Sequence, residues 1–388
     1  MFKSLLILLT FSWAVEISAQ SITGFNLNYE YDPDAEISFK TRPVRQGNEI
    51  RIYYEFKCNR NEYAVTDYLF QWEKRTSVND RSGESIQTNE SILSEDTRHR
   101  TGFLTVQASD KNWFAVVSIT NKTNKGTWNY YAVVERNWPQ EFMLFESGNP
   151  VLSGFINTGV AYRLAETSPG QKIYAYLYKA SFNAAVPPFS KTGSDDRFIK
   201  ADSSFVITDG SFRPATPGLY LLQSDTSSVN GLSVYAAEKP FPKYNTIQGL
   251  ASPLIYLTTS DEQSQLTQIG NDKSRFDKII VDMVGDAGRA RTFMRSYYQR
   301  VEQANRLFTG FKEGWKTDMG MIYMIFGVPS EVSRNTSFEI WFYKGTGTKF
   351  IFSRSGSVFA PITYFLTRNE IYTQDWYSTI DLWRKSRF

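Results

Sequence analysis

The stretch Phe311-Lys-Glu-Gly-Trp-Lys-Thr-Asp-Met-Gly-Met-Ile-Tyr-Met-Ile-Phe-Gly-Val-Pro329 decides how the C-terminal part of this chain folds. Thr317 or Asp318 stands where a helix N-cap belongs, because its side-chain oxygen can accept from the unpaired N–H groups of a helix start. Trp315 should bury its indole against the preceding helix while the indole N–H finds a carbonyl. The glycines at 314, 320 and 327 suit positive φ or close backbone approach. Pro329 suits the end of a short helix or strand. The stretch therefore predicts a packed junction at the head of a new segment.

Eight residues of this stretch make up a known pattern, in the order Gly314, Trp315, Thr317, Asp318, Gly320, Tyr323, Gly327 and Pro329. Through them the chain resembles the GWxTD-domain proteins, exported proteins of Bacteroidota and related bacteria. The resemblance covers the chain from Arg275 to Ala360. This family has no established biochemical activity, so the resemblance implies an exported protein without implying a reaction.

Asp318 is the one carboxylate embedded in the motif. A functional interpretation makes it a general acid, a general base or a contact for a partner. A structural interpretation makes Thr317 or Asp318 the helix cap and Trp315 the anchor. We favour cap and anchor, because the motif places no second titratable partner beside Asp318.

The residues of common catalytic sites are scarce. His99 is the only histidine and Cys58 the only cysteine, so we expect neither a zinc site nor a catalytic triad. His99 should lie in a solvated loop, and Cys58 should be a buried, inert thiol. The sequence contains no nucleophile elbow, P-loop or dinucleotide-binding fingerprint. We therefore predict no enzyme, no catalytic residue, no cofactor and no metal ligand.

The first residues predict export. Residues 1–19 carry one positive charge, then the apolar run Leu5–Val15, and end on the small residue Ala19 before Gln20, as in a secretory signal peptide. No other run reaches the ~18 to 20 apolar residues that span a bilayer, so the mature chain should have no transmembrane segment. A net charge of +3 without a basic patch argues against nucleic acid as a partner. We expect a periplasmic or outer-membrane-associated protein.

Alternating apolar and polar residues dominate residues 20–145 and again 146–240. Glu49–Cys58 shows the period of two most clearly, and Thr216–Leu222 resembles the Pro-Gly turn and late strand of immunoglobulin-like modules. The two regions predict two immunoglobulin-like β-sandwich modules. Lys239–Pro242 then predicts a linker, because its two prolines provide no backbone donors.

Beyond the linker the apolar period changes to that of a helix, which predicts a third unit over 241–388. Phe276–Val284 and Phe293–Phe311 predict an amphipathic helical hairpin. Phe338–Tyr343 and Lys349–Phe352 predict a β-hairpin, in an order similar to the small outer-membrane-assembly domains of the SmpA/OmlA type. Trp341 and Tyr343 of this hairpin join the eight motif residues as candidates for a structural or partner-binding role. We expect this α+β unit to fold alone.

Two functional hypotheses follow from this organisation. The first is a non-enzymatic cell-envelope scaffold or adaptor, which binds a protein partner at the periplasmic face of the outer membrane and serves outer-membrane assembly or secretion. Its partner would be an outer-membrane barrel or a secretion component. The second is an exported carbohydrate-binding or carbohydrate-processing protein, because sandwich modules accompany such enzymes and exposed aromatic rings stack on sugars.

Overall fold

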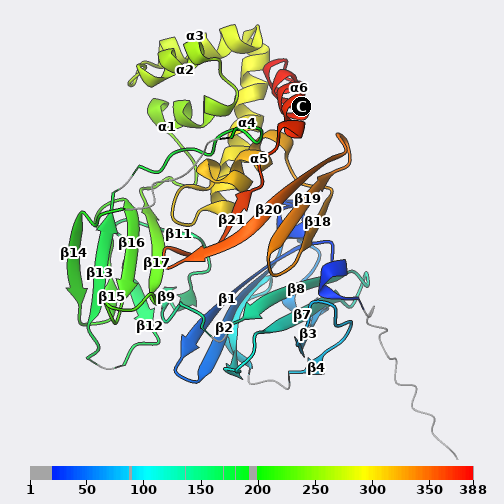
Figure 1. The fold of residues 1–388 in the computed structure, drawn as a ribbon, viewed down its shortest axis with the longest axis vertical. Coiled ribbons are helices and arrows are strands. Elements are labelled where there is room, and N and C mark those ends of the chain that lie inside the picture. Colours follow the sequence, from blue (N-terminus) through cyan, green and yellow to red (C-terminus); the bar gives the residue numbers. More distant parts are fainter. Residues whose placement is uncertain are drawn as a thin grey trace, which may run out of the picture.

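The computed structural model describes residues 20–86, 90–135, 137–168, 170–179, 181–191 and 199–387, and the signal peptide expected at 1–19 lies outside them. The described chain forms five β-sheets and a C-terminal helical region (Figure 1). The predicted order of a strand-rich N-terminal part and a helical C-terminal part is confirmed. In Figure 1 the first two sheets lie at the bottom, the next two at the left and the helices at the top.

The first unit consists of two four-stranded antiparallel sheets packed face to face. One has the order β1 (Ile37–Gln46), β2 (Glu49–Cys58), β6 (His99–Gln107), β5 (Glu90–Glu95), and the other the order β4 (Glu84–Ser85), β3 (Tyr68–Arg75), β7 (Trp113–Asn121), β8 (Thr127–Val134). The predicted apolar face of β2 lines the core between them, and Cys58 is buried there as a free thiol. The loop position predicted for His99 is wrong: it pairs with Lys57 at the start of β6 and lies 3.0 Å from Glu55.

The second unit again packs two sheets around one core. Their orders are β10 (Asn149–Pro150), β9 (Met143–Glu146), β12 (Tyr162–Ala165), β15 (Ser211–Phe212), and β11 (Phe155–Asn157), β17 (Leu232–Ala237), β16 (Gly218–Gln223), β13 (Ile173–Tyr178), β14 (Ser203–Ile207). Strands β11 and β17 run parallel, whereas the other pairs are antiparallel. The linker Lys239–Pro242 follows β17, and both of its X-Pro bonds are cis.

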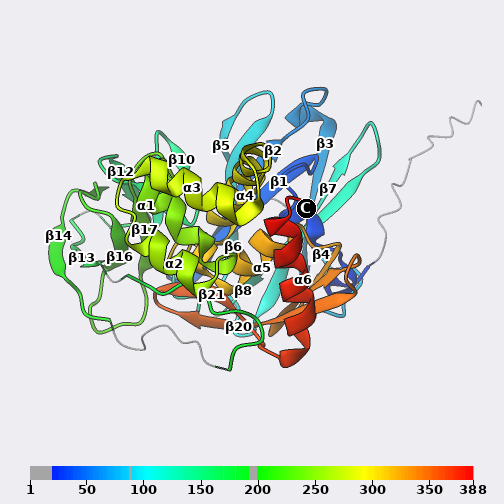
Figure 2. The same cartoon turned by 90° about the horizontal axis from the view of Figure 1, so that it is seen from above.

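The C-terminal unit places helices over one face of the fifth sheet. The helices are α1 (Ile247–Ala251), α2 (Ser260–Thr267), α3 (Lys273–Val284), α4 (Ala287–Phe308), α5 (Asp318–Phe326) and α6 (Thr373–Arg384). The antiparallel sheet has the order β18 (Glu331–Arg334), β19 (Phe338–Tyr343), β20 (Thr348–Ser357), β21 (Ala360–Leu366). From above, α1, α2 and α3 lie on one side of α5 and α6 lies on the other (Figure 2). Helices α3 and α4 contain the predicted helical hairpin, and β19 and β20 contain the predicted β-hairpin.

Each of the two sandwiches has its own core, whereas the core of the C-terminal unit takes in residues from the N-terminal part of the chain. Ile22, Phe25, Leu27 and Tyr31 from the N-terminal segment belong to the same buried cluster as α3, α4 and α5. Strand β7 is buried along its whole length, because Phe114 and Val116 on one face join that cluster while its other face fills the first sandwich. A fragment that begins after the linker would therefore lack part of its own core.

The segment between β13 and β14 also joins the C-terminal unit. The sequence suggested an exposed loop around Pro187 and Pro188. Instead Phe182 packs edge-on against Phe311, and the N–H of Ala185 donates to the carbonyl of Lys316 at 2.9 Å. Residues 192–198 lie outside the described chain. The second unit thus contacts the GWxTD motif directly through this segment.

Candidate functional site

The motif residues connect α4 to α5. Helix α4 ends at Phe308, residues Gly314–Lys316 form one 3-10 turn, and α5 begins at Asp318. Gly314 lies so close to α4 that a Cβ built on it would be 2.0 Å from the carbonyl oxygen of Ala304. A side chain does not fit at that distance, so this position requires glycine for close backbone approach.

Trp315 is the anchor of the connection, and only 3% of it is exposed. Its indole N–H donates to the hydroxyl of Tyr244 at 2.8 Å, a hydroxyl in place of the carbonyl that the sequence suggested. Its backbone N–H donates to Oδ1 of Asn305 in α4 at 3.2 Å, and its carbonyl accepts from the hydroxyl of Tyr256 at 3.1 Å. Trp315 therefore joins the 3-10 turn to α4 and to the segment that follows the linker.

Thr317 is the N-cap of α5, so of the two candidate caps the structure uses the threonine. Its Oγ1 accepts from the N–H of Gly320 at 3.0 Å and donates to the carbonyl of Gly314 at 2.7 Å. Gly320 has no room for a side chain, because a Cβ would lie 1.8 Å from that same carbonyl oxygen. The hydroxyl and the two glycines together fix the angle at which α5 begins.

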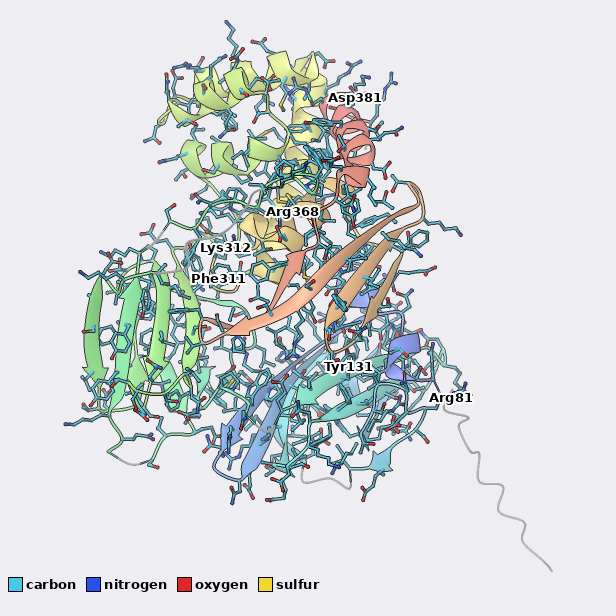
Figure 3. The ribbon with its side chains drawn as sticks, in the orientation of Figure 1. Arg81, Tyr131, Phe311, Lys312, Arg368 and Asp381 are labelled. Carbon is cyan, nitrogen blue, oxygen red and sulfur yellow. The ribbon has the colours of Figure 1, made fainter. Side chains whose placement is uncertain are left out.

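Asp318 ties α5 to the far end of the sheet. Its carboxylate accepts from the N–H of Leu366 at 2.8 Å and from Arg368 at 2.5 and 3.3 Å. Arg368 also donates to the carbonyl of Val186, and it lies where the helical layer meets the sheet (Figure 3). Both carboxylate oxygens are engaged, and the partner cation is 50 residues further along the chain. The motif alone gave no signal for Arg368.

The remaining motif residues complete α5 and its exit. The hydroxyl of Tyr323 lies 3.1 Å from the carbonyl oxygen of Tyr31, in the N-terminal segment. Gly327 ends the helix with φ at +82°, a conformation that side chains rarely adopt. Its carbonyl accepts from the hydroxyl of Tyr343 at 2.9 Å. Pro329 is buried just before β18.

Trp341 and Tyr343 face inward from β19 toward α4 and α5. Trp341 is fully buried, and its indole N–H donates to Oε1 of Glu339 at 2.7 Å. Both aromatic residues therefore belong to the core of the C-terminal unit. A buried carboxylate such as Glu339 needs its own partners, since an unpaired charge in this environment is costly.

Those partners come from the N-terminal segment and from β18. Arg334 pairs with Glu339, and it pairs with Glu30 at 2.7 Å, while the hydroxyl of Tyr31 donates to Glu339. Burial alone would lower the pKa of Arg334, but the two carboxylates hold it well above its ordinary value. Burial raises the pKa of Glu30, and Arg334 opposes that rise. This four-residue cluster joins the two ends of the chain, and nothing in the sequence indicated it.

The opposite face of the same sheet is apolar and open. We call it the outer sheet face, and it carries Phe338, Ile340, Phe342, Ile351 and Phe365. Exposed fractions are 42% for Phe338, 36% for Ile351 and 44% for Phe365. Ile340 lies directly opposite Ile351, and Phe338 and Phe365 are both opposite Ser353, so the five side chains form one patch. The alternation of residues in β19 predicts two faces of the strand. The two candidates taken from the sequence, Trp341 and Tyr343, both lie on the buried face.

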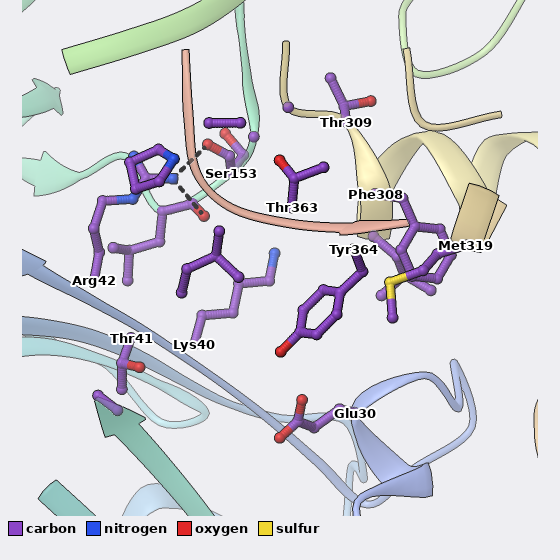
Figure 4. Close-up of a pocket in the computed structure, with 18 of the residues that line it drawn as sticks. Glu30, Lys40, Thr41, Arg42, Ser153, Phe308, Thr309, Met319, Thr363 and Tyr364 are labelled. Atoms are coloured by element: carbon purple, nitrogen blue, oxygen red, sulfur yellow. Dashed lines mark hydrogen bonds between the residues drawn. The ribbon is translucent and has the colours of Figure 1, made fainter. Parts of the chain in front are cut away.

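A cavity of about 510 Å³ lies where the three units meet. Figure 4 shows β1 on one side of it and β21 on the other, with the end of α4 nearby. Lys40 and Arg42 enter from β1, Ser153 from the second unit, and Thr363 and Tyr364 from β21. The motif reaches this cavity as well, because Thr317 contributes to its lining together with Met319 of α5.

Comparison with known proteins identifies the class of the C-terminal part. Residues 218–385 match the family model described as the GWxTD domain. This chain is therefore a GWxTD domain-containing protein, as the motif indicated. The match begins with β16, inside the second unit, and so extends further toward the N-terminus than the resemblance seen in the sequence. No curated protein matches the chain.

The described residues contain neither a membrane-spanning helix nor a cluster of metal-binding side chains. None of the described helices has both the length and the apolar character required to cross a membrane. Within the same residues, no group of three or more histidine, cysteine, aspartate or glutamate side chains is arranged to hold a metal ion.

Proposed function

We propose that this protein is an exported, non-enzymatic scaffold or adaptor of the cell envelope that binds a protein partner at the periplasmic face of the outer membrane. Its partner would be an outer-membrane barrel or a secretion component, and its role would lie in outer-membrane assembly or secretion. The signal peptide expected at 1–19 and the GWxTD domain support export. The motif residues support a role as scaffold, because their polar groups bind other parts of the same chain.

The observation that carries the proposal is the outer sheet face. Five large apolar side chains gather on one face of the C-terminal sheet, with Ile340 opposite Ile351 and with Phe338 and Phe365 on either side of Ser353. A patch of this kind marks a protein-binding surface more often than a solvated one. Lys349 lies beside it, with its ammonium 5.5 Å from the centre of the Phe342 ring. An apolar centre with a charged rim is the usual anatomy of a protein interface.

We also propose that the second unit is immunoglobulin-like. The hydroxyl of Tyr220 in β16 donates to the carbonyl of Thr216 at 2.9 Å, four residues upstream. This local bond between a core tyrosine and the turn before its strand has the geometry of the tyrosine corner found in immunoglobulin-like sandwiches. It occurs in the Thr216–Leu222 segment that the sequence singled out.

The carbohydrate alternative has less support in the described residues. Stacking on sugars requires exposed aromatic rings, and no tryptophan or tyrosine of the two described sandwiches is strongly exposed. Glycoside hydrolysis requires two carboxylates across a cleft. Asp318 faces Arg368, and the described lining of the central cavity contains one carboxylate, that of Glu30.

Partner capture by the mature chain tests the proposal. A photo-crosslinking amino acid in place of Ile351, introduced in the native host, should yield one dominant adduct with an envelope protein. Changing Ile340 and Ile351 to serine should abolish capture by affinity purification without altering the melting temperature, because both side chains are part of the patch and not of the core.

The matched control is Leu382→Ser, which removes an apolar side chain with 44% exposure from α6. This variant should capture the partner like the wild type. Equal capture by the Ile340 and Ile351 variant would refute the assignment of the outer sheet face. A labelled chain that remains in the cytoplasm would refute the proposed compartment.

A further inference from the structure

The central cavity has a strongly unequal distribution of charge. Its lining contains five cations, which are Lys40, Arg42, Arg306, Arg334 and Arg354, and one carboxylate, that of Glu30. Three of the cations are neutralised by carboxylates. Arg306 pairs with Glu302 at 2.7 Å, Arg354 pairs with Glu135 at 2.7 Å, and Arg334 pairs with Glu30 and Glu339.

Lys40 and Arg42 have no such partner. They lie two residues apart on β1 and therefore project from the same face of the strand, toward the second and C-terminal units. Arg42 donates to the carbonyls of Val151, Leu152 and Ser153 at 3.0 to 3.4 Å, and these neutral acceptors leave its charge uncompensated. Burial lowers its pKa to about 10, so it stays protonated at neutral pH.

The ammonium of Lys40 makes no hydrogen bond or ion pair with any described residue. Glu55 is opposite it on β2, but that carboxylate bonds to His99 at 3.0 Å and does not reach Lys40. Lys40 is nevertheless exposed, because the cavity admits solvent to its side chain. Burial lowers the pKa of Lys40, the negative charge of Glu55 opposes that change, and the positive charges of Arg42 and Arg306 lower the pKa further. An anion beside Lys40 would relieve this repulsion.

Hydroxyl groups surround the same space. Thr363 and Tyr364 contribute theirs from β21, and neither hydroxyl bonds to another residue in the part of the chain that the structure describes. A volume of about 510 Å³ falls within the range of small-molecule sites. The space therefore offers two cations without an ion-pair partner for an anionic group, and free hydroxyls for a polar body.

We propose that this cavity binds a small hydroxylated oxyanion, with its carboxylate or phosphate group held by Lys40 and attracted by Arg42. Because residues of all three units line the cavity, such a ligand would tie the two sandwiches to the GWxTD domain. The site is distinct from the outer sheet face, so the inference does not rest on the proposed protein partner.

Titration calorimetry on the mature chain at low ionic strength tests the inference with four probes: inorganic phosphate, glucose 6-phosphate, glucuronate and glucose. The first two probes test a phosphate group, and glucuronate tests a carboxylate on a sugar body. We expect at least one of these three anions to bind saturably with a Kd of about 1 mM or tighter. Neutral glucose should not bind.

Three variants locate the binding. Lys40→Met should weaken the affinity by about tenfold or more, because a charge-assisted hydrogen bond is lost. Lys40→Arg should retain it, because a cation with free donors remains. Lys278→Met is the matched control, since Lys278 is an exposed lysine on α3 far from the cavity lining, and it should bind like the wild type.

Lys40 has no partner to lose, so the methionine variant should fold with an unchanged or higher melting temperature. Equal affinity of Lys40→Met and wild type would overturn the inference, and so would the absence of saturable binding by all three anions. Heat that grows without saturation and is the same in Lys278→Met and Lys40→Met would show non-specific ion adsorption, which also overturns it.

Discussion

Replacing Trp315 with alanine should lower the free energy of unfolding by about 3 to 5 kcal/mol, the range for truncating a large buried aromatic side chain. The indole is 3% exposed, so the truncation leaves a cavity in the core that α4 shares with the 3-10 turn. It also removes the 2.8 Å hydrogen bond to Tyr244 and an edge-on contact with Tyr256, whose ring centre is 6.2 Å away.

Equilibrium unfolding in urea, followed by far-ultraviolet circular dichroism, measures this loss. Trp315→Phe should fall between alanine and wild type, since it keeps most of the ring but not the N–H donor. Tyr377→Ala, which removes an aromatic ring with 57% exposure, is the control and should change stability by less than about 1 kcal/mol. A Trp315→Ala protein that keeps wild-type stability but has lost its biological activity would refute the role of Trp315 as an anchor. It would make Trp315 a surface contact instead.

Three further substitutions test neighbouring parts of the account. Gly314→Ala should cost about 1 to 3 kcal/mol or more, measured in the same urea titration, because its Cβ would have to displace the backbone of α4. Asp318→Asn should cost about 2 to 3 kcal/mol at neutral pH, because it leaves the Arg368 charge without a carboxylate; a smaller loss than for an exposed pair would contradict the role of this ion pair. The bond from Arg384 lowers the pKa of Glu262, so this pair stabilises the fold above the unfolded-state pKa of about 4.3 and loses its effect as the pH falls through the folded-state value. The free energy of unfolding of wild type should therefore exceed that of Glu262→Gln by about 1 kcal/mol at pH 7. Thermal melts at falling pH should show this difference vanish once Glu262 is protonated in the folded state, and a difference that persists in strong acid would contradict this assignment.

Local signals in the sequence predicted local structure well. The sequence allows a capping box either at Thr259 and Glu262 or at Ser260 and Gln263, and the first of these opens α2. The apolar spacing of Phe276–Val284 corresponds to the buried side of α3. The residues that predict these features are within one or two helical turns of each other. Helix α6 was missed although Trp376 and Trp383 are seven residues apart on one buried side, a spacing that indicates a helix.

Contacts between distant parts of the chain were not predictable in the same way. Asp318 was expected to act within its motif, but its partner Arg368 comes from beyond β21. Glu30 meets Arg334 from the other end of the chain, and alternation in either segment contains no information about that pairing. The sequence likewise did not indicate that Tyr31 and its neighbours complete the core of the C-terminal unit, hundreds of residues further along the chain.

The separation of structural and binding roles in the C-terminal sheet follows from one property of strands. Neighbouring residues of β19 point to opposite faces, so Trp341 is in the core while Ile340 and Phe342 point outward. Sequence analysis identified the strand and its aromatic residues but not which face the rest of the molecule covers. That choice depends on α4 and α5, which pack against the inner face only.

Native-state hydrogen exchange of the GWxTD connection tests the central claim most directly. The N–H groups of Gly314, Trp315 and Gly320 donate to the side chains of Thr309, Asn305 and Thr317, all inside the fold. If the motif is a structural junction, peptides covering 311–326 should exchange as slowly as those of α4, because opening them requires global unfolding. Exchange of these peptides at the rate of exposed loops, with α4 still protected, would contradict the claim and would point to a motif held open for a ligand or partner.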